Sequence, residues 1–320
     1  MALLTIIVPC FENEANLSDG FTRFLEAEAS LPTGIRVEYV FVDDGSRDGT
    51  FAALAAIRSA HPDRTTVIKL ARNVGIYNAL MAGFERAQGD CITVFPADLQ
   101  EPLELIPRML VHWKAGCKLV ISMREGRTDG VLARLGSWAF HRLLRGVSMR
   151  ELPVGGYGTA LFDRRVMLEL LRIGEKNTNT LLLLTMLGYD YVVVPYVRRE
   201  RLAGRSGWTL TKKIKLFIDS FVAFSFFPIR LITFGGLVLG VLALGYGCVV
   251  LFAALTGSIP VQGWSALMLV TLLVSSFQMI ALGVLGEYVW RTLDTVRRRP
   301  TYVVDTVLDE RVRVAASTEG

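Results

Sequence analysis

Two long stretches without a charged residue lie near the C-terminus, and they constrain the fold of this chain more than any other feature. Residues 231–255 and residues 265–286 contain no Asp, Glu, Lys or Arg. Each stretch exceeds the roughly 20 residues with which an α-helix crosses the ~30 Å hydrocarbon core of a bilayer. The alternative, two buried helices of a soluble core, rarely produces adjacent stretches of this length. We therefore predict two transmembrane helices joined by the short uncharged segment 256–264.

Positive charge flanks this predicted hairpin on both outer sides. Lys212, Lys213 and Lys215 precede it, and Arg291 and the arginines at 297–299 follow it. Basic flanks favour the cytoplasmic face, where they meet anionic lipid headgroups. We therefore expect the region before the hairpin and both chain termini to be cytoplasmic. The net charge of the whole chain, +5, is too small to indicate a nucleic-acid partner.

The segments that flank the hairpin carry weaker signals. Residues 209–227 place apolar side chains at helical spacing with lysines between them, which is typical of an interfacial helix lying on a membrane. A helix that faces a protein core and exposes a basic side remains an alternative. After Pro300, residues 302–304 show a short apolar alternation, and we expect the polar remainder of the tail to be disordered.

The first half of the chain alternates strand-like and helix-like segments. This alternation predicts parallel strands in a Rossmann-like α/β sheet that is covered by helices on both faces. Ligands of such sheets bind beyond the carboxyl ends of the strands. We expect strands at residues 3–8, 37–42, 65–70, 91–95 and 119–122, and helices at 14–28, 48–59 and 76–88, the last ending at Gly89 as a C-cap.

Three polar motifs follow predicted strands. PCFENE at residues 9–14 is a weak signal, because many strand-to-helix turns look like it. VDDGSRDGT at 42–50 contains the adjacent carboxylates Asp43 and Asp44, which suit recognition of a ribose or a base. The same string also reads as a turn followed by a helix N-cap. FPADLQEP at 95–102 offers carboxylate and amide oxygens to Mg²⁺ or Mn²⁺, with substrate phosphates completing the shell.

In this order and spacing, the three motifs resemble glycosyltransferase family 2, which has the GT-A fold. The polyprenyl-phosphate branch of that family is similar in further strings: LARNVG at 70–75, ALMAGF at 79–84, ERLAGRS at 200–206, LGVLGEY at 282–288 and RPTY at 299–302. That branch includes bactoprenol glucosyl transferases, undecaprenyl-phosphate aminoarabinose transferases and, more distantly, dolichol-phosphate mannose synthase. The resemblance extends from about residue 4 to residue 304.

The resemblance implies a membrane enzyme of the bacterial inner membrane. It implies inverting, Mg²⁺- or Mn²⁺-dependent transfer of a sugar from a nucleotide-sugar donor to a polyprenyl phosphate such as undecaprenyl phosphate. The product would supply cell-envelope glycan or lipid modification. Relatives form homo-oligomers through their membrane helices, which we also expect here. The layout would be a GT-A domain, an interfacial helix, a transmembrane hairpin and a basic tail, over residues 1–208, 209–228, 229–290 and 291–320.

The resemblance also implies roles for individual residues. The catalytic set is Asp98, Arg124, Ser137 and Arg205. The donor-binding set is Pro9, Phe11, Glu14, Asp43, Asp44 and Asp98. The metal ligands are Asp98 and Gln100, and the groups that handle the acceptor phosphate are Arg124, Arg134 and Ser137. Arg205 would lie on a loop that closes over the donor phosphates.

Three positions depart from the family pattern. Relatives commonly have an acid at Pro96, an Asp at Gly156 and a Lys at Gly207. These departures motivate an alternative, a catalytically weakened membrane scaffold that binds nucleotide sugar or lipid. A processive polysaccharide synthase is a further alternative, but neither Gln262 nor Gln278 begins the Gln-x-x-Arg-Trp motif of those enzymes.

Overall fold

The computed structural model describes most of the chain as two compact units. Residues 1–219 with 300–320 make up the first unit, and residues 220–299 make up the second. Within them the structure describes residues 1–125, 157–173, 180–197, 227–256, 263–297 and 299–309. The boundary at residue 208 and residues 209–226 of the predicted interfacial helix lie outside these ranges, and residues 227–228 are the start of the long helix Phe227–Leu255.

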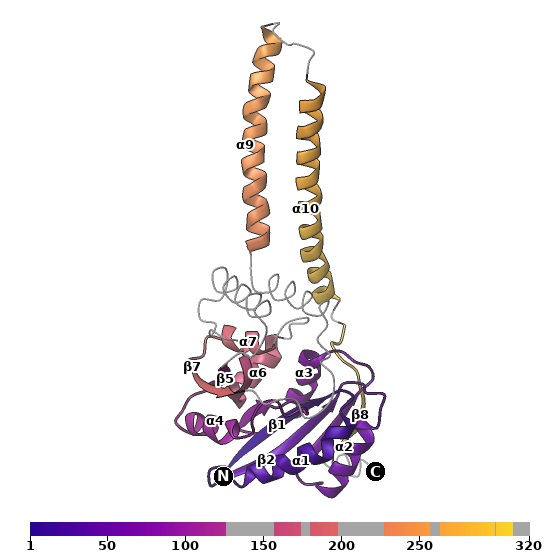
Figure 1. Cartoon of the computed structure of the whole chain (residues 1–320), viewed down its shortest axis with the longest axis vertical. Coiled ribbons are helices and arrows are strands. Elements are labelled where there is room, and N and C mark those ends of the chain that lie inside the picture. The colour runs from indigo at the N-terminus through magenta and orange to yellow at the C-terminus, as the bar shows by residue number, and fades with distance from the viewer. Residues whose placement is uncertain (126–156, 174–179, 198–226, 257–262, 298, 310–320) are drawn as a thin grey trace. The chain divides into compact units, whose positions relative to one another are not determined.

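The first unit is built on a single sheet (Figure 1). The order of the strands is β7-β5-β6-β4-β1-β2-β3-β8. Their bounds are β1 Ala2–Cys10, β2 Ile35–Asp43, β3 Thr65–Leu70, β4 Cys91–Val94, β5 Leu119–Glu125, β6 Tyr157–Asp163, β7 Tyr191–Val197 and β8 Val304–Leu308. All five predicted strands are present, and β6, β7 and β8 come in addition.

The sheet is mixed, whereas the alternation of strands and helices predicted parallel pairing. β1 pairs in parallel with β2 and β4, β2 with β3, and β5 with β7. β6 lies between β4 and β5 and is antiparallel to both, and β8 is antiparallel to β3. The predicted parallel pairing is confirmed for β1 to β4, and the antiparallel strands β6 and β8 were not predicted. Because β6 reverses direction between them, β5 still runs the same way as β1, β2 and β4.

Six described helices belong to this unit: α1 Glu14–Glu28, α2 Thr50–Ala60, α3 Ile76–Arg86, α4 Leu105–Lys114, α6 Arg164–Ile173 and α7 Thr180–Met186. α1 has the predicted bounds. α3 ends at Arg86 with Ala87 as its C-cap, so the prediction of Gly89 as the C-cap was wrong. The Gly89 amide instead donates to the hydroxyl of Thr5 and the carboxylate of Glu38. A Cβ at Gly89 would lie 2.6 Å from the backbone nitrogen of Thr5, which excludes a side chain there.

Helices cover both faces of the sheet, as predicted. Successive strand residues point to opposite sides, so each strand buries side chains under the helices of both faces. One face buries Ile6, Val8 and Phe41 together with the apolar sides of α1, α2 and α4. The other face meets α3, whose Gly83 approaches the side chains of Ile7 and Val42. Burial on both faces explains why β1 and β2 are continuous apolar runs. Each buried Leu, Ile, Val or Phe contributes about 1.5–3 kcal/mol by leaving water.

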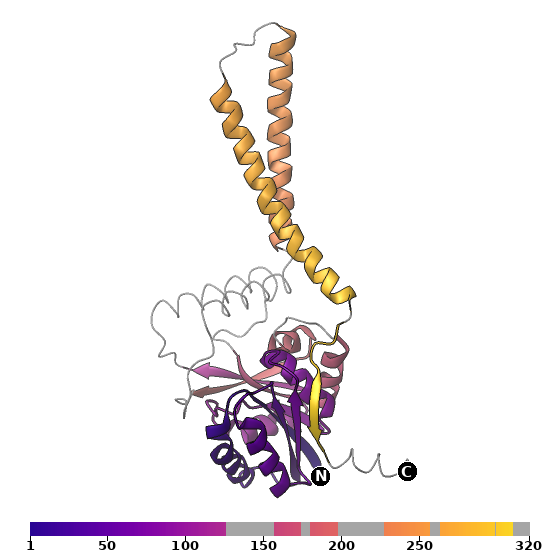
Figure 2. The same cartoon turned by 90° about the vertical axis from the view of Figure 1, so that its right-hand side faces the viewer.

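The C-terminal segment joins this sheet. Val304–Leu308 forms β8, which pairs with β3 from Val67 to Leu70 and includes one register shift. Figure 2 shows β8 as the yellow strand in the sheet. The expectation of a disordered tail after residue 304 was therefore wrong for residues 305–308. Those residues belong to the first unit, although they follow the hairpin in the sequence.

The second unit contains two long helices, α9 Phe227–Leu255 and α10 Trp264–Val296, which run side by side (Figure 1). Within them, Leu231–Val249 and Leu273–Asp294 are long and apolar enough to cross a membrane, with mean hydropathies of 2.0 and 1.3 and no burial inside the structure. Gly235 and Gly236 of α9 face the ring of Phe277 on α10, and a Cβ at Gly235 would lie 3.0 Å from that ring. α10 also extends beyond the predicted span 265–286.

Candidate functional site

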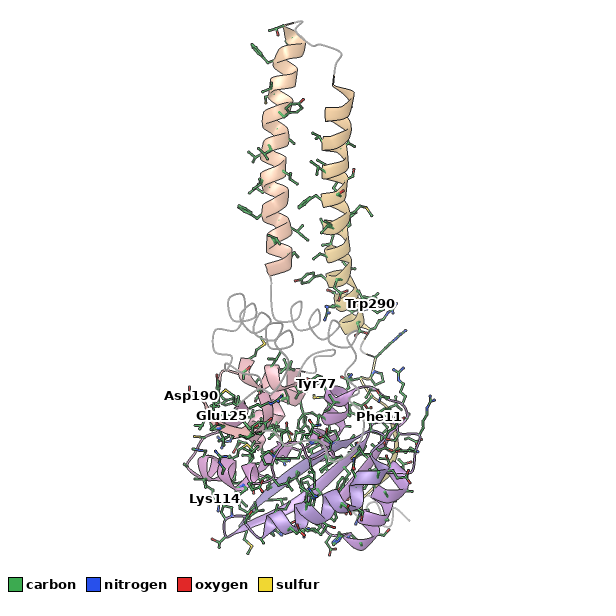
Figure 3. All side chains as sticks on the ribbon, in the orientation of Figure 1. Phe11, Tyr77, Lys114, Glu125, Asp190 and Trp290 are labelled. Carbon is green, nitrogen blue, oxygen red and sulfur yellow. The ribbon has the colours of Figure 1, made fainter. Side chains whose placement is uncertain are left out.

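The predicted site residues of three strands lie at one edge of the sheet. β1 is flanked by β2 and β4, and all three strands run in the same direction. Their carboxyl ends therefore bring the segments that follow Cys10, Asp43 and Val94 to the same edge. Neighbouring strands lie about 4.8 Å apart, which places the ends of β2 and β4 about 10 Å from each other. Figure 3 shows Phe11, directly after β1, and Tyr77, in the first turn of α3, at this end of the sheet.

Asp44 is held by backbone amides at this edge. Its Oδ1 accepts a hydrogen bond from the Val74 amide at 2.7 Å, and its Oδ2 accepts one from the Gly75 amide at 2.9 Å. The Asp44 amide in turn donates to the carbonyl of Cys10 at 2.9 Å. Burial raises the pKa of Asp44 to about 6, against the two amide donors that lower it, and the neighbouring Asp43 raises it further. The carboxylate is therefore a fixed acceptor that titrates close to neutral pH.

Asp43 is more deeply buried than its neighbour. The residue has no exposed surface, and its Oδ1 accepts a hydrogen bond from the Ser46 amide at 2.9 Å. Its Oδ2 is buried and has no hydrogen-bond partner within the described part of the chain. Leaving a buried acceptor unsatisfied costs about 1–3 kcal/mol. Desolvation, and then the charge of Asp43, raise the pKa of the neighbouring Cys10 thiol, so Cys10 is not a nucleophile here.

The segment after β1 is a tight turn fixed by side chains. Glu12 has a φ of 52°, in the left-handed region that few residues other than glycine adopt. The Glu12 amide donates to Ser46 Oγ at 3.0 Å, and the Asn13 amide donates to Thr50 Oγ1 at 2.9 Å. Phe11, just before the turn, leaves 42% of its surface exposed. An exposed aromatic side chain held on a rigid turn is suited to stacking against a planar ligand.

The predicted donor residue Glu14 has a structural partner. Its Oε2 accepts a hydrogen bond from the Gly49 amide at 2.9 Å, which ties the start of α1 to the start of α2. Asp48 Oδ1 accepts from the Thr50 amide at 3.1 Å. The N-cap of α2 is Gly49, and no side chain of the described residues caps the helix, so the predicted capping by Asp48 was wrong. The second motif therefore connects α1 to α2 and also places Asp43 and Asp44 at the polar edge of the sheet.

The third motif forms a turn after β4 in which Asp98 and Gln100 flank a left-handed residue. Leu99 has a φ of 45°, and its side chain is only 6% exposed within the core. Its Cδ1 lies against α1, 3.7 Å from the position that a Cβ on Gly20 would take. The buried Leu99 side chain thus holds an otherwise unfavourable turn in place.

Asp98 and Gln100 are the candidate metal ligands. A carboxylate and an amide oxygen two residues apart fit the preference of Mg²⁺ and Mn²⁺ for oxygen ligands. No group of three His, Cys, Asp or Glu side chains suited to a metal is found in the described ranges. Bound phosphate oxygens and waters are the usual further ligands of Mg²⁺ at a site with so few side chains.

Arg124 belongs to the same edge through β5. It is the second-last residue of that strand and stands opposite Tyr196 in the parallel pairing with β7. Ser137, Arg134 and Arg205 lie outside the described residues, as do the departures at Gly156 and Gly207.

The residues that hold Asp44 were not assigned a role from the sequence. The segment 71–75 supplies the Val74 and Gly75 amides, and a Cβ at Gly45 would lie 2.5 Å from the carbonyl carbon of Arg72. We call residues 71–75 the 71–75 loop. The available sequence signal was Gly75, which precedes a predicted helix and adopts a φ of 88°.

Comparison with known proteins gives a consistent picture. The sequence profile of Glycosyl transferase family 2 matches residues 5–171. The chain is 35% identical to the uncharacterized glycosyltransferase YkcC of Bacillus subtilis, over 94% of this chain and 92% of that protein. It is 32% identical to the SfII prophage-derived bactoprenol glucosyl transferase of Shigella flexneri, over 94% of this chain and 97% of that protein.

A solved structure, the mannosyltransferase PcManGT from Pyrobaculum calidifontis in complex with GDP-Man and Mn²⁺, is 23% identical with a TM-score of 0.46. The match covers 63% of this chain and 58% of that one. A likeness at this level carries no conclusion about the ligands of the present chain.

Proposed function

The chain belongs to glycosyltransferase family 2, and from this membership we propose that it transfers a sugar from a nucleotide-sugar donor to a polyprenyl phosphate in the membrane. The observation that carries the proposal is the 32% identity to a protein named a bactoprenol glucosyl transferase, which extends over 94% of this chain. The match is long enough to include the two apolar helices as well as the sheet.

The polar edge of the sheet would bind the donor. Asp43 and Asp44 would accept hydrogen bonds from the base and the ribose. Oδ2 of Asp43 has an unused acceptor position, but it is fully buried, so a contact with the donor would require the turn after β2 to open. Phe11 would stack on the base, with Pro9 and Glu14 lining the pocket. Because Asp44 is held by two amides, it would bind the donor without rearranging, which reduces the entropy lost on binding.

Asp98 and Gln100 would hold a divalent cation on the donor diphosphate. When bound, Mg²⁺ or Mn²⁺ would neutralise the charge that develops on the departing nucleotide diphosphate. The turn fixed by Leu99 supports this role, because it keeps the two oxygen ligands in one arrangement. Arg205 would add positive charge from the loop that closes over the phosphates.

The acceptor would be oriented by Arg124, together with Arg134 and Ser137. A polyprenyl phosphate is already an anion near neutral pH, so its oxygen needs no general base before it attacks the anomeric carbon. Attack from the face opposite the leaving diphosphate would invert the configuration at that carbon. The bond to the nucleotide diphosphate breaks as the bond to the lipid phosphate forms.

The connectivity of the chain supports a membrane hairpin with both outer ends on one side. β8 follows α10 in the sequence but pairs with β3 of the sheet. The last described strand before α9, β7, and the strand after α10, β8, therefore belong to the same sheet. The basic flanks would place that sheet in the cytoplasm of a bacterium, beside the inner membrane. The glycine-rich α9 would permit close helix contacts in a homo-oligomer.

A transfer assay tests the proposal. Membranes that contain the protein are incubated with undecaprenyl phosphate and a panel of labelled nucleotide sugars, with and without EDTA. We expect label from one donor in the organic-extractable lipid, and we expect EDTA to remove it. Asp98→Ala should reduce the rate by at least a hundredfold, because both metal binding and diphosphate neutralisation are lost. Label that resists both EDTA and Asp98→Ala would contradict the proposed metal role.

A non-catalytic scaffold that binds nucleotide sugar or lipid is the second candidate. Pro96 favours it, because a proline two residues before Asp98 contributes no carboxylate to a metal site. Nucleotide-sugar binding by intact protein, without lipid labelling from any donor, would support the scaffold.

A further inference from the structure

The segment that follows α10 is attached to the donor side of the sheet at several points. We call residues 302–308 the C-terminal strap. Its strand β8 pairs with β3, and the ladder continues one step further, where the Ala71 amide donates to the carbonyl of Val303 at 2.9 Å. Ala71 is the first residue of the 71–75 loop, so the strap reaches the start of the segment that holds Asp44.

The 71–75 loop is rigidly connected to the paired carboxylates. The Val74 and Gly75 amides donate to the two oxygens of Asp44 at 2.7 and 2.9 Å. The backbone of the loop also packs on Gly45, where a Cβ would lie 2.5 Å from Arg72. A displacement of the loop would therefore move the donors of both Asp44 hydrogen bonds together.

The strap also holds the far end of α3. The hydroxyl of Tyr302 bonds to the Glu85 carboxylate, and burial together with this bond raises the pKa of Tyr302. Glu85 is in the last turn of α3, whose N-cap is Gly75 of the 71–75 loop. The strap thus fixes the loop at its start through Val303, and it fixes the end of the helix that follows the loop through Tyr302.

The strap leaves its first two valines exposed, Val303 at 55% and Val304 at 38%, while Leu308 packs against the edge of the core. The main cores on either face of the sheet consist of β1, β2 and the helices packed on them. Removing the strap should therefore leave the sheet folded while releasing the end of β3, which would become an unpaired edge.

From these contacts we propose that the C-terminal strap is a positioning element for the nucleotide-sugar donor, acting on Asp44 through the 71–75 loop. The proposal rests on the proposed function, since it assigns Asp44 to donor binding. It makes the donor pocket depend on residues that come after both membrane helices.

Two truncations form a matched pair that tests the strap. A chain that ends at Thr301 lacks it, whereas a chain that ends at Asp309 retains it. We expect the first to raise the donor KM at least tenfold and to leave the KM for the lipid acceptor within twofold. The chain that ends at Asp309 should keep both values. A peptide of residues 300–309 added to the shorter chain should restore the donor KM at least in part.

Single substitutions separate the tyrosine contact from the strand. Tyr302→Phe in the full chain removes only the hydroxyl, and Glu85→Ala removes its acceptor. We expect each to raise the donor KM about threefold, and the double variant to show no further increase. Glu85→Gln, which retains an acceptor oxygen, should stay close to the parent protein. Independent, additive effects of the two substitutions would overturn the proposed contact.

Hydrogen exchange distinguishes a wrong role for the strap from a wrong proposed function. In the chain that ends at Thr301, the amides of Val74 and Gly75 should exchange at least tenfold faster, with β1 and β2 unchanged. This readout needs no substrate. Unchanged exchange and an unchanged donor KM would overturn the role of the strap. Faster exchange in the chain that ends at Thr301, together with a full-length protein that transfers no sugar, would instead contradict the enzyme assignment alone.

Discussion

Adjacent residues can have very different environments, and Asp43 and Asp44 illustrate this. Asp43 is fully buried and satisfies one oxygen through the Ser46 amide. Asp44 has both oxygens bonded to amides of the 71–75 loop, and its pKa is raised to about 6. The protonation state of Asp44 therefore changes in a pH range where the protein can be assayed.

The first residue-scale prediction concerns pH. The pKa of Asp44 is about 6 in the folded protein, above the ordinary value of 3.8. The folded protein therefore binds this proton more tightly than the unfolded chain does, and protonation of Asp44 stabilises the fold. This contribution to the free energy of unfolding is complete below pH 3.8 and is lost as the pH rises to about 6. Donor binding has the opposite dependence, because an ionised Asp44 is the better acceptor. We expect the donor Kd to be constant above pH 7 and about tenfold larger at pH 5.

Asp44→Asn provides the control for this pH dependence. The amide cannot titrate, so the variant should bind the donor weakly but with a flat profile between pH 5 and pH 7. Isothermal titration calorimetry measures both proteins directly. A parent profile that is flat over the same range would show that Asp44 does not control donor binding.

The sequence located the polar residues better than it located their partners. Asp44 and Asp98 were predicted at the carboxyl edge because each follows a strand-like run. The amides of Val74 and Gly75 could not be predicted as partners of Asp44, since a backbone N–H has no sequence signature. The left-handed conformation of Leu99 was equally hidden, because leucine gives no indication of positive φ.

At the scale of elements, the turn after β2 and the 71–75 loop pack backbone against backbone. Gly45 has a φ of 69°, and a Cβ there would lie 2.5 Å from the carbonyl carbon of Arg72. Glycine is therefore required at this position for two reasons, its backbone conformation and the close approach of the loop.

Gly45→Ala and Gly34→Ala separate these two reasons. Gly34 has a φ of 83°, but a Cβ there meets nothing within 4 Å. We expect Gly34→Ala to lower the free energy of unfolding by about 1 kcal/mol through backbone strain, with no change in donor KM. Gly45→Ala should lower it by about 2–3 kcal/mol and raise the donor KM, because the 71–75 loop must move. Urea unfolding and donor kinetics measure the two effects. An unchanged donor KM in Gly45→Ala would show that the position of the 71–75 loop does not affect donor binding.

Long, continuous apolar segments were the most predictable elements. β3 and α1 have the predicted bounds, because burial on both faces of a sheet and a complete amphipathic period leave clear patterns. β8 was not predicted as part of the sheet. It is a short edge strand with an exposed start, and its partner β3 is distant in the sequence, so local pattern carries little information about it.

At the scale of the whole molecule, the chain leaves the first unit, forms the two apolar helices and returns to the first unit. This path follows from the pairing of β8 with β3 and from the assignment of residues 300–320 to the first unit. For a protein placed in a membrane, we expect both helices to cross as a hairpin, because a single crossing would separate β8 from its partner strand.

Labelling with a membrane-impermeant thiol reagent tests this path. In a background with Cys117→Ser and Cys248→Ser, which removes the two cysteines that are not buried, we expect Ser258→Cys, in the connection between the helices, to be labelled in intact bacterial cells. Glu12→Cys and Asp309→Cys should be labelled only after the cells are opened, because both belong to the first unit. Labelling of Asp309→Cys in intact cells would contradict both the hairpin and the pairing of β8 in the membrane-bound protein.

The position of β8 also has a consequence for biosynthesis. A ribosome makes β3 early, and residues 71–303, which include both apolar helices, must be made before β8 emerges. The outer edge of β3 therefore stays open while the two apolar helices are synthesised. A chain whose synthesis stops before residue 304 would leave that edge exposed to the cell's chaperones and proteases.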